Sequence, residues 1–392
     1  MSMTREVVLV DAARSAFGKR GGMFKNVDAL DLGAHVLKGL LEKTDLLNRT
    51  KVDDVFIGSA YSDAISNAAG RYVVLAAGLP EDVSGTYIEM QCGSAITALN
   101  YAAYKIAMGG ADVICVGGVE SHSRKIVKFP TWLDSHKFIA PAALPVKFGP
   151  QDWQNTPMPY NSDLMAKEWD ISRTACDEYA LRSQQGMAKA ISTGFTGPEI
   201  IPYVVPATRK APEMVLDKDE HPRPSTTMES LSKLAPIYEG GVTTAGNSSG
   251  VNDGAAFILL MSAEKAKECG YIPYARWVYG ASAGCKPNLM GIGASYSNLK
   301  ALKALGMKLS DIDVWESNEA FAAQILSCIK DMQEQTGETV DMSKFNPNGA
   351  SGARVTWWAM KQLEQTGGRY GCISSCCGGG QGTTAIIENL RR

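Results

Sequence analysis

The strongest constraint on the fold is that the two halves of the chain repeat one pattern. Residues 37–60 and 299–320 each read as a helix, a short polar link and a strand. One constant interval relates three pairs of positions: Val55 and Val314, Val113 and Cys372, and Cys92 and Ser351. Three matches at one interval indicate an internal duplication. We therefore predict two similar units that pack together.

Strands and helices alternate along the chain, which places it in the α/β class. Apolar runs rich in β-branched residues, typical of buried strands, occur at 5–13, 52–60 and 111–121. Residues 28–44 have the spacing of an amphipathic helix, and a second predicted helix at 96–110 is closed by glycine. This alternation favours a sheet of largely buried strands covered by helices.

The region between the halves differs in character. Residues from 121 to about 240 carry many Pro, Trp and Met residues at irregular spacing, with one clear helix at 173–192. Such a stretch is typical of a long excursion that binds substrate or covers a site. We predict a first half at 1–120, an inserted loop domain at 121–241, the return of the first half at 242–268 and a second half at 269–392.

Composition excludes several classes of function. The 392 residues have a net charge of −2 and no dense run of Lys or Arg, so we expect neither nucleic acid nor a membrane as partner. Nine cysteines without CxxC pairs argue against a disulfide framework and favour the reducing cytoplasm. No secretory signal or long apolar span occurs. No histidine lies near Cys376 and Cys377 in the sequence, so we expect no metal site.

Cys92 is the first candidate nucleophile. It precedes a predicted helix of small residues, where unpaired backbone N–H groups and the helix dipole lower the pKa of a thiol. The small residues Gly93, Ser94 and Ala95 leave room for a substrate. The alternative is a buried structural cysteine, which is the commoner role of free cysteines.

Cys376 is the second candidate, because it ends a predicted strand and three glycines follow almost at once. Ligands bind at strand ends in open α/β sheets, and glycines such as Gly378 expose backbone N–H groups to a developing oxyanion. The neighbouring Cys377 points to the opposite face of a continuing strand, so we expect it to lie in the core. Neither glycine-rich stretch is a GxGxxG fingerprint, and a dinucleotide site is not supported.

Asn318 lies where a strand at 314–317 turns into a helix. Its side chain either caps that helix, the commoner role, or donates to a bound carbonyl or water. Residues 242–262 place small and turn-forming residues before an apolar strand, which suits close approach to a narrow ligand or simply a tight loop.

Taken together, five motifs resemble the thiolase family, in the family's order and over nearly the whole chain. They are QCGSAITALNYAAYKIAMGGADVICVGGVES at 91–121, TTAGNSSGVNDGAA at 243–256, ESNEAFAAQ at 316–324, ASGAR at 350–354 and CCGGGQG at 376–382. The resemblance implies a duplicated α/β fold with five layers, αβαβα, and a loop domain inserted in the first half. It also implies coenzyme A thioester substrates and homodimers or homotetramers.

The resemblance also implies roles for individual residues. Cys92 is similar to the nucleophile that accepts an acyl group, and Cys376 to the acid/base that moves the α-proton and the proton of the leaving thiol. The N–H groups of Cys92 and Gly378 resemble one oxyanion hole, and Asn318 with a water resembles part of another. Residues that match the coenzyme A channel are Met158, Arg223, Ala245, Ser249, Ala320 and Phe321.

One segment departs from the family. Members of the family carry a Gly-His-Pro segment whose histidine activates the nucleophile, whereas here Asn348 and Gly349 run directly into Ala350, and about ten positions are absent. The four histidines are His35, His122, His136 and His221, and none lies near this place in the sequence. Either the deletion belongs to the natural protein or the chain as given lacks a segment.

We predict an acyl-CoA C-acyltransferase that cleaves a 3-oxoacyl-CoA or runs the reverse Claisen condensation through an acyl-Cys92 intermediate, with ping-pong kinetics. We expect no cofactor, since coenzyme A is a substrate. The alternatives are a non-catalytic or impaired coenzyme A-binding subunit and, less favoured, a ketoacyl-synthase-like enzyme. Pro157 and the long aromatic insertion suggest a branched, aromatic or dicarboxylic acyl chain, and an accessory subunit is a further hypothesis.

Overall fold

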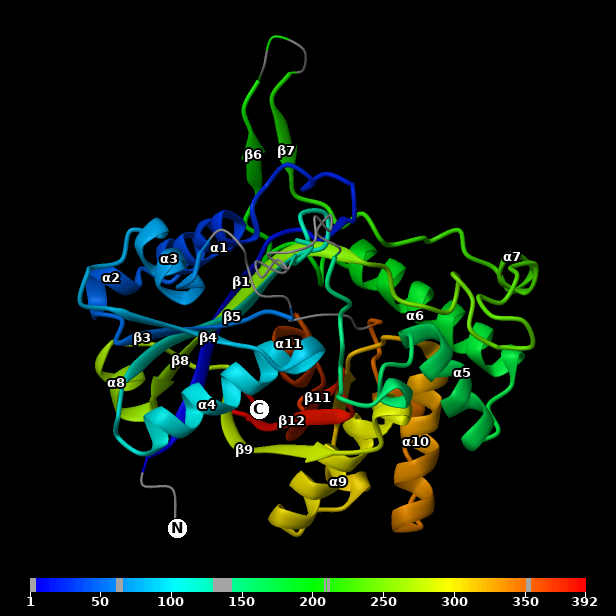
Figure 1. Ribbon diagram of the computed structural model, residues 1–392. Coiled ribbons are helices and arrows are strands. Elements are labelled where there is room, and N and C mark those ends of the chain that lie inside the picture. Colours follow the sequence, from blue (N-terminus) through cyan, green and yellow to red (C-terminus); the bar gives the residue numbers. More distant parts are fainter. Residues whose placement is uncertain (1–4, 61–65, 130–142, 208, 210–211, 350–353) are drawn as a thin grey trace, which may run out of the picture.

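A computed structural model describes residues 5–60, 66–129, 143–207, 209, 212–349 and 354–392 (Figure 1). The elements before the inserted region are β1 (Val7–Arg14), β2 (Gly18–Lys19), α1 (Ala29–Lys43), α2 (Leu46–Arg49), β3 (Asp54–Gly58), α3 (Ala69–Ala76), β4 (Ser84–Ile88), η1 (Gln91–Gly93), α4 (Ser94–Ala107) and β5 (Val113–Ser121). The inserted region holds η2 (Asp152–Gln154), α5 (Met158–Glu168), α6 (Arg173–Ser192), β6 (Tyr203–Val205), β7 (Met214–Leu216) and α7 (Met228–Ser232).

After the inserted region the chain returns to the first half with β8 (Asn252–Ser262) and α8 (Ala263–Glu268). The second half comprises β9 (Ala275–Gly284), η3 (Pro287–Ile292), α9 (Gly293–Leu305), η4 (Leu309–Asp311), β10 (Val314–Ser317), α10 (Ala322–Thr336), η5 (Met342–Lys344), α11 (Val355–Thr366), β11 (Tyr370–Cys377) and β12 (Gln381–Asn389). The strands and helices predicted in the first half and the helix at 173–192 are confirmed.

Local chemistry explains why the predicted helices form. Asp28 caps α1 by accepting a hydrogen bond from the N–H of Leu30 at 3.0 Å, and the apolar face of α1 is buried. Helix α6 begins in the same way, because the Ser172 side chain accepts from the N–H of Ala175. Capping and periodicity depend on neighbouring residues only, which is why both helices are readable from the sequence.

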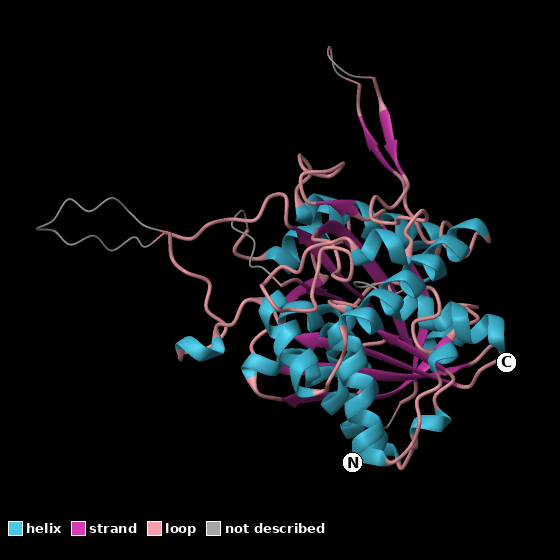
Figure 2. Cartoon of the chain, turned by 90° about the vertical axis from the view of Figure 1, so that its right-hand side faces the viewer, coloured by secondary structure: helices cyan, strands magenta, loops and turns pink. Residues whose placement is uncertain are grey.

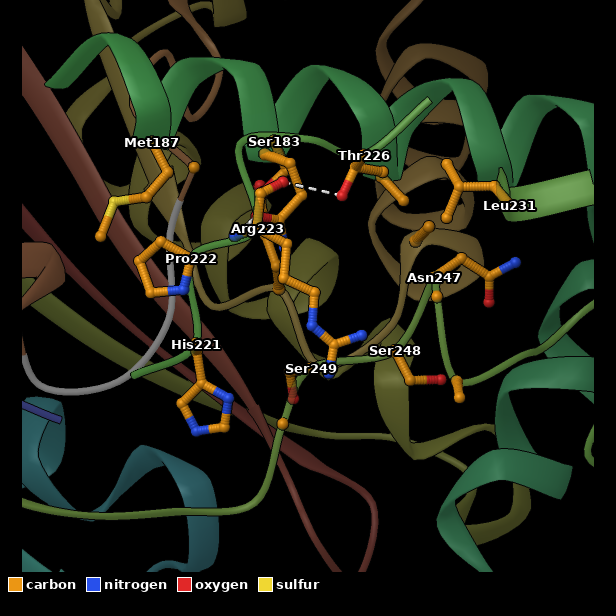
Figure 3. Close-up of a pocket in the computed structure, with 18 of the residues that line it drawn as sticks. Ser183, Met187, His221, Pro222, Arg223, Thr226, Leu231, Asn247, Ser248 and Ser249 are labelled. Carbon is orange, nitrogen blue, oxygen red and sulfur yellow. Dashed lines mark hydrogen bonds between the residues drawn. The ribbon is translucent and has the colours of Figure 1, made fainter. Parts of the chain in front are cut away.

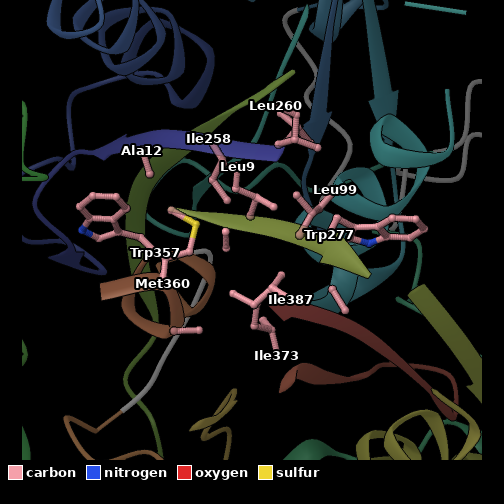
Figure 4. Packing of buried hydrophobic residues seen from close by; sticks show 14 of the residues in the cluster. Leu9, Ala12, Leu99, Ile258, Leu260, Trp277, Trp357, Met360, Ile373 and Ile387 are labelled. Carbon is pink, nitrogen blue, oxygen red and sulfur yellow. The ribbon is translucent and has the colours of Figure 1, made fainter. Parts of the chain in front are cut away.

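Five layers of secondary structure stack in the order αβαβα, as predicted (Figure 1). Helices α1, α3 and α8 pack on one face of the strands of the first half. Helices α4 and α11 lie between the strands of the two halves, and α9 and α10 cover the other face of the second half. Figure 4 shows the central layer, in which Leu99 of α4 and Met360 of α11 pack with residues of both halves such as Leu260 and Ile387.

One sheet runs through both halves, in the strand order β10-β11-β12-β9-β1-β8-β5-β3-β4, with β2 paired to β8. The join is a short antiparallel ladder between Val7–Leu9 of β1 and Ala275–Trp277 of β9. The two similar units are therefore hydrogen-bonded to each other as well as packed together. In each half the parallel strands direct their carboxyl ends to one edge.

The two halves differ at one equivalent position. In the first half β4 runs parallel to β3, with Phe56 opposite Thr86. In the second half the matching positions are Trp315 and Phe345, and they form an isolated parallel bridge instead of a ladder. The shortened strand stands just before Gly349, where the family's Gly-His-Pro segment is absent. The predicted match of Cys92 with Ser351 lies outside the described residues.

The inserted region contains more regular structure than its composition predicts. Helix α5 is rich in Pro, Asn, Ser and Asp residues, which are poor helix formers, and it is stabilised by packing on η3 and α10. Strands β6 and β7 form a hairpin that stands away from the layered body (Figure 2). Among the described residues, no helix is long and apolar enough to cross a membrane.

Candidate active site

Cys92 lies in the single turn η1 that leads into α4, as predicted for a cysteine at a helix N-terminus. Gln91, the residue before it, has a φ of +49°, a left-handed conformation that costs a non-glycine residue about 1 kcal/mol. Glutamine is held there by its side chain, whose Nε2 donates to the carbonyl of Ala60 at 3.2 Å. The strained turn presents Cys92 as an exposed residue at the end of the sheet.

The electrostatic prediction for Cys92 is wrong. The surrounding protein atoms desolvate the thiol and raise its pKa, and the Glu120 carboxylate raises it further, although the residue reaches solvent. The helix dipole, worth about 0.3–1 kcal/mol at such a site, does not outweigh these two effects. Cys92 therefore rests as a thiol and needs a proton acceptor before it attacks.

Cys376 and Cys377 end β11, and both are buried. Burial raises the pKa of the Cys376 thiol well above its usual value, and the nearby charge of a Cys92 thiolate raises it further. Cys376 packs in a cluster with Met165, Met290 and Cys328. The two candidate thiols, far apart in the sequence, are thus within electrostatic reach of each other.

Cys377 faces the other side of β11, as the alternation of a strand requires. A side chain at Gly93 would collide with the Cys377 sulfur, so these two residues are in close contact. Burial raises the pKa of Cys377, and its thiol donates weakly to the carbonyl of Ser375 at 3.7 Å. The prediction that Cys377 belongs to the core is confirmed, and its contact with Gly93 joins η1 to β11.

Gly378 lies directly beside the nucleophile's turn. A Cβ atom at Gly378 would come within 3.0 Å of the Gln91 and Phe148 side chains. The turn that follows closes when the N–H of Cys285 donates to the carbonyl of Gly380 at 2.8 Å. Only glycine fits between Gln91 and Phe148 without displacing one of them, and the backbone of Gly378 thereby reaches the vicinity of Cys92.

Asn318 follows β10 directly, and its N–H donates to the carbonyl of Ser374 on the neighbouring parallel strand at 2.9 Å. Helix α10 begins only at Ala322, with Phe321 in the capping position. Asn318 is therefore not the cap of that helix, and the commoner of its two predicted roles is wrong. Residues 319–321 lie between Asn318 and α10, which leaves Asn318 at the sheet edge beside Ser374, two residues before Cys376.

A cavity of about 640 Å³ opens beside this edge. Its lining includes the predicted residues Arg223, Ala245 and Ser249. Figure 3 shows the Arg223 side chain extending toward Ser248 and Ser249, with His221 below it. The cavity is walled by residues of α6, by the chain at 219–231 and by the loop at 245–250, which come from distant parts of the sequence.

The other predicted binding residues border the cavity or the thiols. Ala320 accepts a hydrogen bond from the N–H of Ser249 at 3.0 Å, and Phe321 forms a bridge with Ser248. Met158, at the start of α5, packs with Ala320 against the cluster that contains Cys376. None of Cys92, Cys376, Asn318 or Gly378 lines the described part of the cavity. Ala320 thus touches both regions, and the cavity adjoins the thiols without enclosing them.

The three histidines that the structure describes lie in three different parts of the fold. His221 lines the cavity, where burial and the charge of Arg354 lower its pKa. His122 follows the end of β5, and burial together with Lys125 and Arg20 lowers its pKa against the pull of Asp253. His35 binds the carbonyl of Pro202 at the surface. His136 lies outside the described residues.

Sequence reasoning missed three residues that contact the candidate site: Glu120, Gln91 and Phe148. A signal for Glu120 was present, because an acidic residue ends a buried strand. Phe148 has no such signal, since it reaches Gly378 from the irregular inserted region. The structure also places Glu316 at the end of β10, buried with neither carboxylate oxygen hydrogen-bonded, and burial raises its pKa well above the usual value.

No group of three ligating side chains suited to a metal ion occurs in the described ranges. The reactive groups gathered at the sheet edge are thiols, backbone N–H groups and a carboxylate. This set suits acyl transfer through a covalent cysteine intermediate.

Comparisons with known proteins agree with this chemistry. Residues 7–264 match the N-terminal domain of thiolase, and residues 271–389 match its C-terminal domain. The beta-ketoadipyl-CoA thiolase of Pseudomonas aeruginosa is 39% identical over 407 aligned positions, covering 99% of this chain and 100% of the relative. The alignment is longer than the 392 residues here, so that relative carries residues that this chain lacks.

Solved structures of thiolases are also similar to this chain. The acetyl-CoA acetyltransferase of Bacillus anthracis superposes with a TM-score of 0.89 at 34% identity, covering 100% of both chains. Human mitochondrial 3-ketoacyl-CoA thiolase in complex with CoA superposes with a TM-score of 0.88 at 33% identity, covering 100% of this chain and 99% of the other. A non-catalytic role is not favoured by these comparisons. The chain belongs to the thiolase family and is an acyl-CoA acyltransferase.

Proposed function

We propose that this thiolase forms an acyl thioester on Cys92 and uses Cys376 to move protons at the second substrate. The observation that carries the proposal is the convergence of the two thiols with the backbone of Gly378 at one sheet edge. Splitting the reaction through a covalent intermediate replaces one difficult displacement with two easier ones.

The steps balance in the degradative direction. The Cys92 sulfur gives its proton to a basic group of the site and bonds to the 3-oxo carbon, and the bond between C2 and C3 breaks. Its electron pair passes to C2, which takes the Cys376 proton, and the C1–C2 fragment leaves as acetyl-CoA. Free coenzyme A then gives its proton to the Cys376 thiolate and collects the acyl group as the shortened acyl-CoA, while the departing Cys92 sulfur takes its proton back from the same basic group. No cofactor is needed, because coenzyme A is itself a substrate.

Backbone and amide groups stabilise the negative charge that develops on oxygen. The N–H groups of Cys92 and Gly378 form one oxyanion site, supported by the contact of Gln91 with Gly378. Asn318, through a water, serves the other. A single preorganised donor of this kind is worth about 10²–10³ in rate, because it needs no reorganisation during the reaction.

The cavity holds coenzyme A, with Arg223 near its phosphates. Arg223 is exposed at the cavity, where a guanidinium binds phosphate through charge-assisted hydrogen bonds. Met158, Ala245, Ser249, Ala320 and Phe321 complete the channel. The solved human relative that superposes over the whole chain contains CoA, which supports this assignment.

Arg223→Ala is expected to raise the KM for coenzyme A about tenfold and to leave kcat within threefold, because it removes uniform binding far from the reacting atoms. Initial rates at varied coenzyme A concentration measure this. Arg209→Ala removes an equal charge from the neighbouring hairpin link and is the matched control. An unchanged KM in the Arg223 variant would remove Arg223 from the channel.

The acyl chain of the substrate ends in a carboxylate. A beta-ketoadipyl-CoA thiolase is similar over nearly the whole chain, which supports a dicarboxylic substrate. Exposed Arg20 and Lys125 both act on His122, two residues beyond Glu120, so positive charge gathers around the end of β5. Such charge attracts a terminal carboxylate and improves its capture.

The substrate test compares thiolysis of 3-oxoadipyl-CoA with thiolysis of acetoacetyl-CoA. We expect kcat/KM to be at least tenfold higher for 3-oxoadipyl-CoA, and Lys125→Ala to reduce that ratio selectively. Equal or better thiolysis of acetoacetyl-CoA would exclude the dicarboxylic assignment while leaving the thiolase chemistry intact.

The protein assembles as a homodimer or homotetramer. Ile126, Val127 and Phe129 on one limb of the inserted region, and Leu144 and Val146 on the other, are exposed apolar side chains. These limbs stand away from the layered body (Figure 2). An exposed apolar arm of this kind marks an interaction surface, and a second copy of the chain is its proposed occupant.

Val127→Glu combined with Val146→Glu is expected to shift the sedimentation coefficient toward that of a smaller assembly, because buried charges destabilise an apolar interface. Ile272→Glu, which changes an exposed apolar residue outside the arm, serves as control. Unchanged sedimentation of the double variant would argue against an interface between copies, and a heavier complex formed only with another protein would indicate an accessory subunit.

We place the protein in the cytoplasm. All nine cysteines are free, and reactive thiols persist best in a reducing compartment.

A further inference from the structure

Glu120 ends β5 at the sheet edge, and the loop that follows β3 holds its carboxylate. The N–H of Ala60 donates to Glu120 Oε2 at 2.7 Å, and the hydroxyl of Ser59 donates to Oε1 at 3.2 Å. Strands β3 and β5 are parallel neighbours, with Gly58 opposite Gly118, so this loop and Glu120 extend beyond the same edge. The carboxylate therefore has a fixed position relative to the sheet.

The same loop also holds the residues on both sides of Cys92. The side chain of Gln91 donates to the carbonyl of Ala60 at 3.2 Å, and the hydroxyl of Ser94 donates to the carbonyl of Ser59 at 3.2 Å. Ser94 in turn accepts from the N–H of Met90 at 2.8 Å, which closes the turn around the nucleophile. Glu120 and Cys92 are thus tied to one short loop by hydrogen bonds on either side.

Electrostatics agrees with this geometry. Burial raises the pKa of the Cys92 thiol, and the charge of Glu120 raises it further, so the sulfur lies within electrostatic reach of the carboxylate. A thiolate beside an ionised carboxylate is disfavoured, whereas a thiolate beside a carboxylic acid is not. Transfer of the proton to the carboxylate itself therefore removes the repulsion that keeps Cys92 protonated.

The chain also lacks the segment that would otherwise supply a base. Gly349 is followed at once by Ala350, where the family's Gly-His-Pro segment is expected, and the strand before it is reduced to the bridge between Trp315 and Phe345. Because Cys92 rests as a thiol, its attack on a carbonyl requires another acceptor.

We propose that Glu120 accepts the Cys92 proton, directly or through one water, as Cys92 attacks the 3-oxo carbon. The S–H bond breaks and an O–H bond forms on Glu120, while the sulfur bonds to carbon and the C2–C3 electron pair leaves with C2. When coenzyme A later displaces the acyl group, Glu120 returns the proton to the departing Cys92 sulfur. This inference rests on the proposed function of Cys92 as the acylated nucleophile.

Glu120→Gln is the decisive variant, because glutamine keeps an oxygen for the N–H of Ala60 and loses the basic carboxylate. Two rates at Cys92 are compared at pH 8: acylation by acetoacetyl-CoA in a single turnover, followed by intact mass, and alkylation by iodoacetamide. We expect acylation to fall at least 10²-fold, the usual contribution of a positioned base. We expect alkylation to rise several-fold, because the charge that opposes the thiolate is gone.

Two further variants complete the test. Glu120→Asp keeps a carboxylate and is expected to recover part of the acylation rate. Glu89→Gln removes a neighbouring carboxylate that accepts from the N–H of Gln91, and both of its rates are expected to stay within threefold of the unaltered protein. Thermal unfolding confirms that each variant is folded.

A fall in acylation together with a rise in alkylation shows that the Glu120 carboxylate transfers a proton, because a carboxylate that only supports the fold would not change the two rates in opposite directions. If acylation and alkylation fall together in Glu120→Gln, the carboxylate only holds the loop, and the proposal is overturned. Acylation within threefold of the unaltered protein overturns it as well. If the unaltered protein itself forms no acyl adduct, the proposed function and this inference both fail. A failure confined to the Glu120 variants overturns this inference and leaves the proposed function standing.

Discussion

Cys92→Ala is expected to reduce thiolysis of 3-oxoacyl-CoA by a factor on the order of 10⁴ or more and to abolish the acyl adduct. The reason is that the sulfur forms the covalent intermediate, so its loss removes the two-step route rather than weakening it. Intact-protein mass after mixing with acetoacetyl-CoA measures the adduct, and coupled release of acetyl-CoA measures turnover.

Cys269→Ala is the matched control for this experiment. Cys269 is partly exposed, like Cys92 it is a free thiol, and its sulfur lies near the carbonyl of Arg49, away from the candidate site. The control should keep both turnover and adduct. An adduct that persists in Cys92→Ala and maps to another residue would show that the nucleophile is assigned wrongly.

Cys376→Ser is expected to lower turnover by about 10²–10⁴-fold while Cys92 remains open to alkylation. Serine has nearly the size of cysteine, but its hydroxyl is too weak an acid to exchange protons with an α-carbon. The direct readout is exchange of the C2 hydrogens of acetyl-CoA with deuterium oxide, followed by mass spectrometry. This exchange should be lost, because it requires the proton carrier and not the C–C bond cleavage.

The neighbouring thiol provides an internal comparison. Cys377 is also buried at the end of β11, but it faces Gly93 rather than the cluster around Cys376. Cys377→Ala should therefore keep deuterium exchange within tenfold of the unaltered protein, while losing some stability from the cavity it leaves. Exchange that survives in Cys376→Ser and disappears in Cys377→Ala would reverse the two roles.

Much of the fold followed from local patterns. The repeat that relates Val55 to Val314 predicted two similar halves, and the helix at 173–192 has the bounds that its spacing indicated. The inserted region was the exception, because α5 has poor helix formers and is stabilised by contacts that lie far away in the sequence. Helix propensity is a weak effect that tertiary packing overrides.

Some features of the candidate site also followed from local patterns, and others did not. The sequence by itself determined that Cys92 opens a helix and that Cys376 ends a strand, because capping and strand alternation depend on adjacent residues. It did not determine the state of the thiol, whose pKa is raised by burial and by Glu120 rather than lowered by the helix. It also favoured the helix cap as the commoner of two roles for Asn318, whereas Phe321 holds the capping position because three further residues precede α10.

Only the tertiary structure decided which groups meet. Phe148 and Gln91 enclose Gly378 from two different regions, and Ala60 holds both Glu120 and Gln91, the residue before Cys92, by hydrogen bonds. The periodic patterns of strands and helices extend over a few adjacent residues and can therefore be recognised in the sequence. The distance between side chains that lie far apart in the sequence depends on sheet register and on how the inserted region packs, and these are properties of the folded chain as a whole.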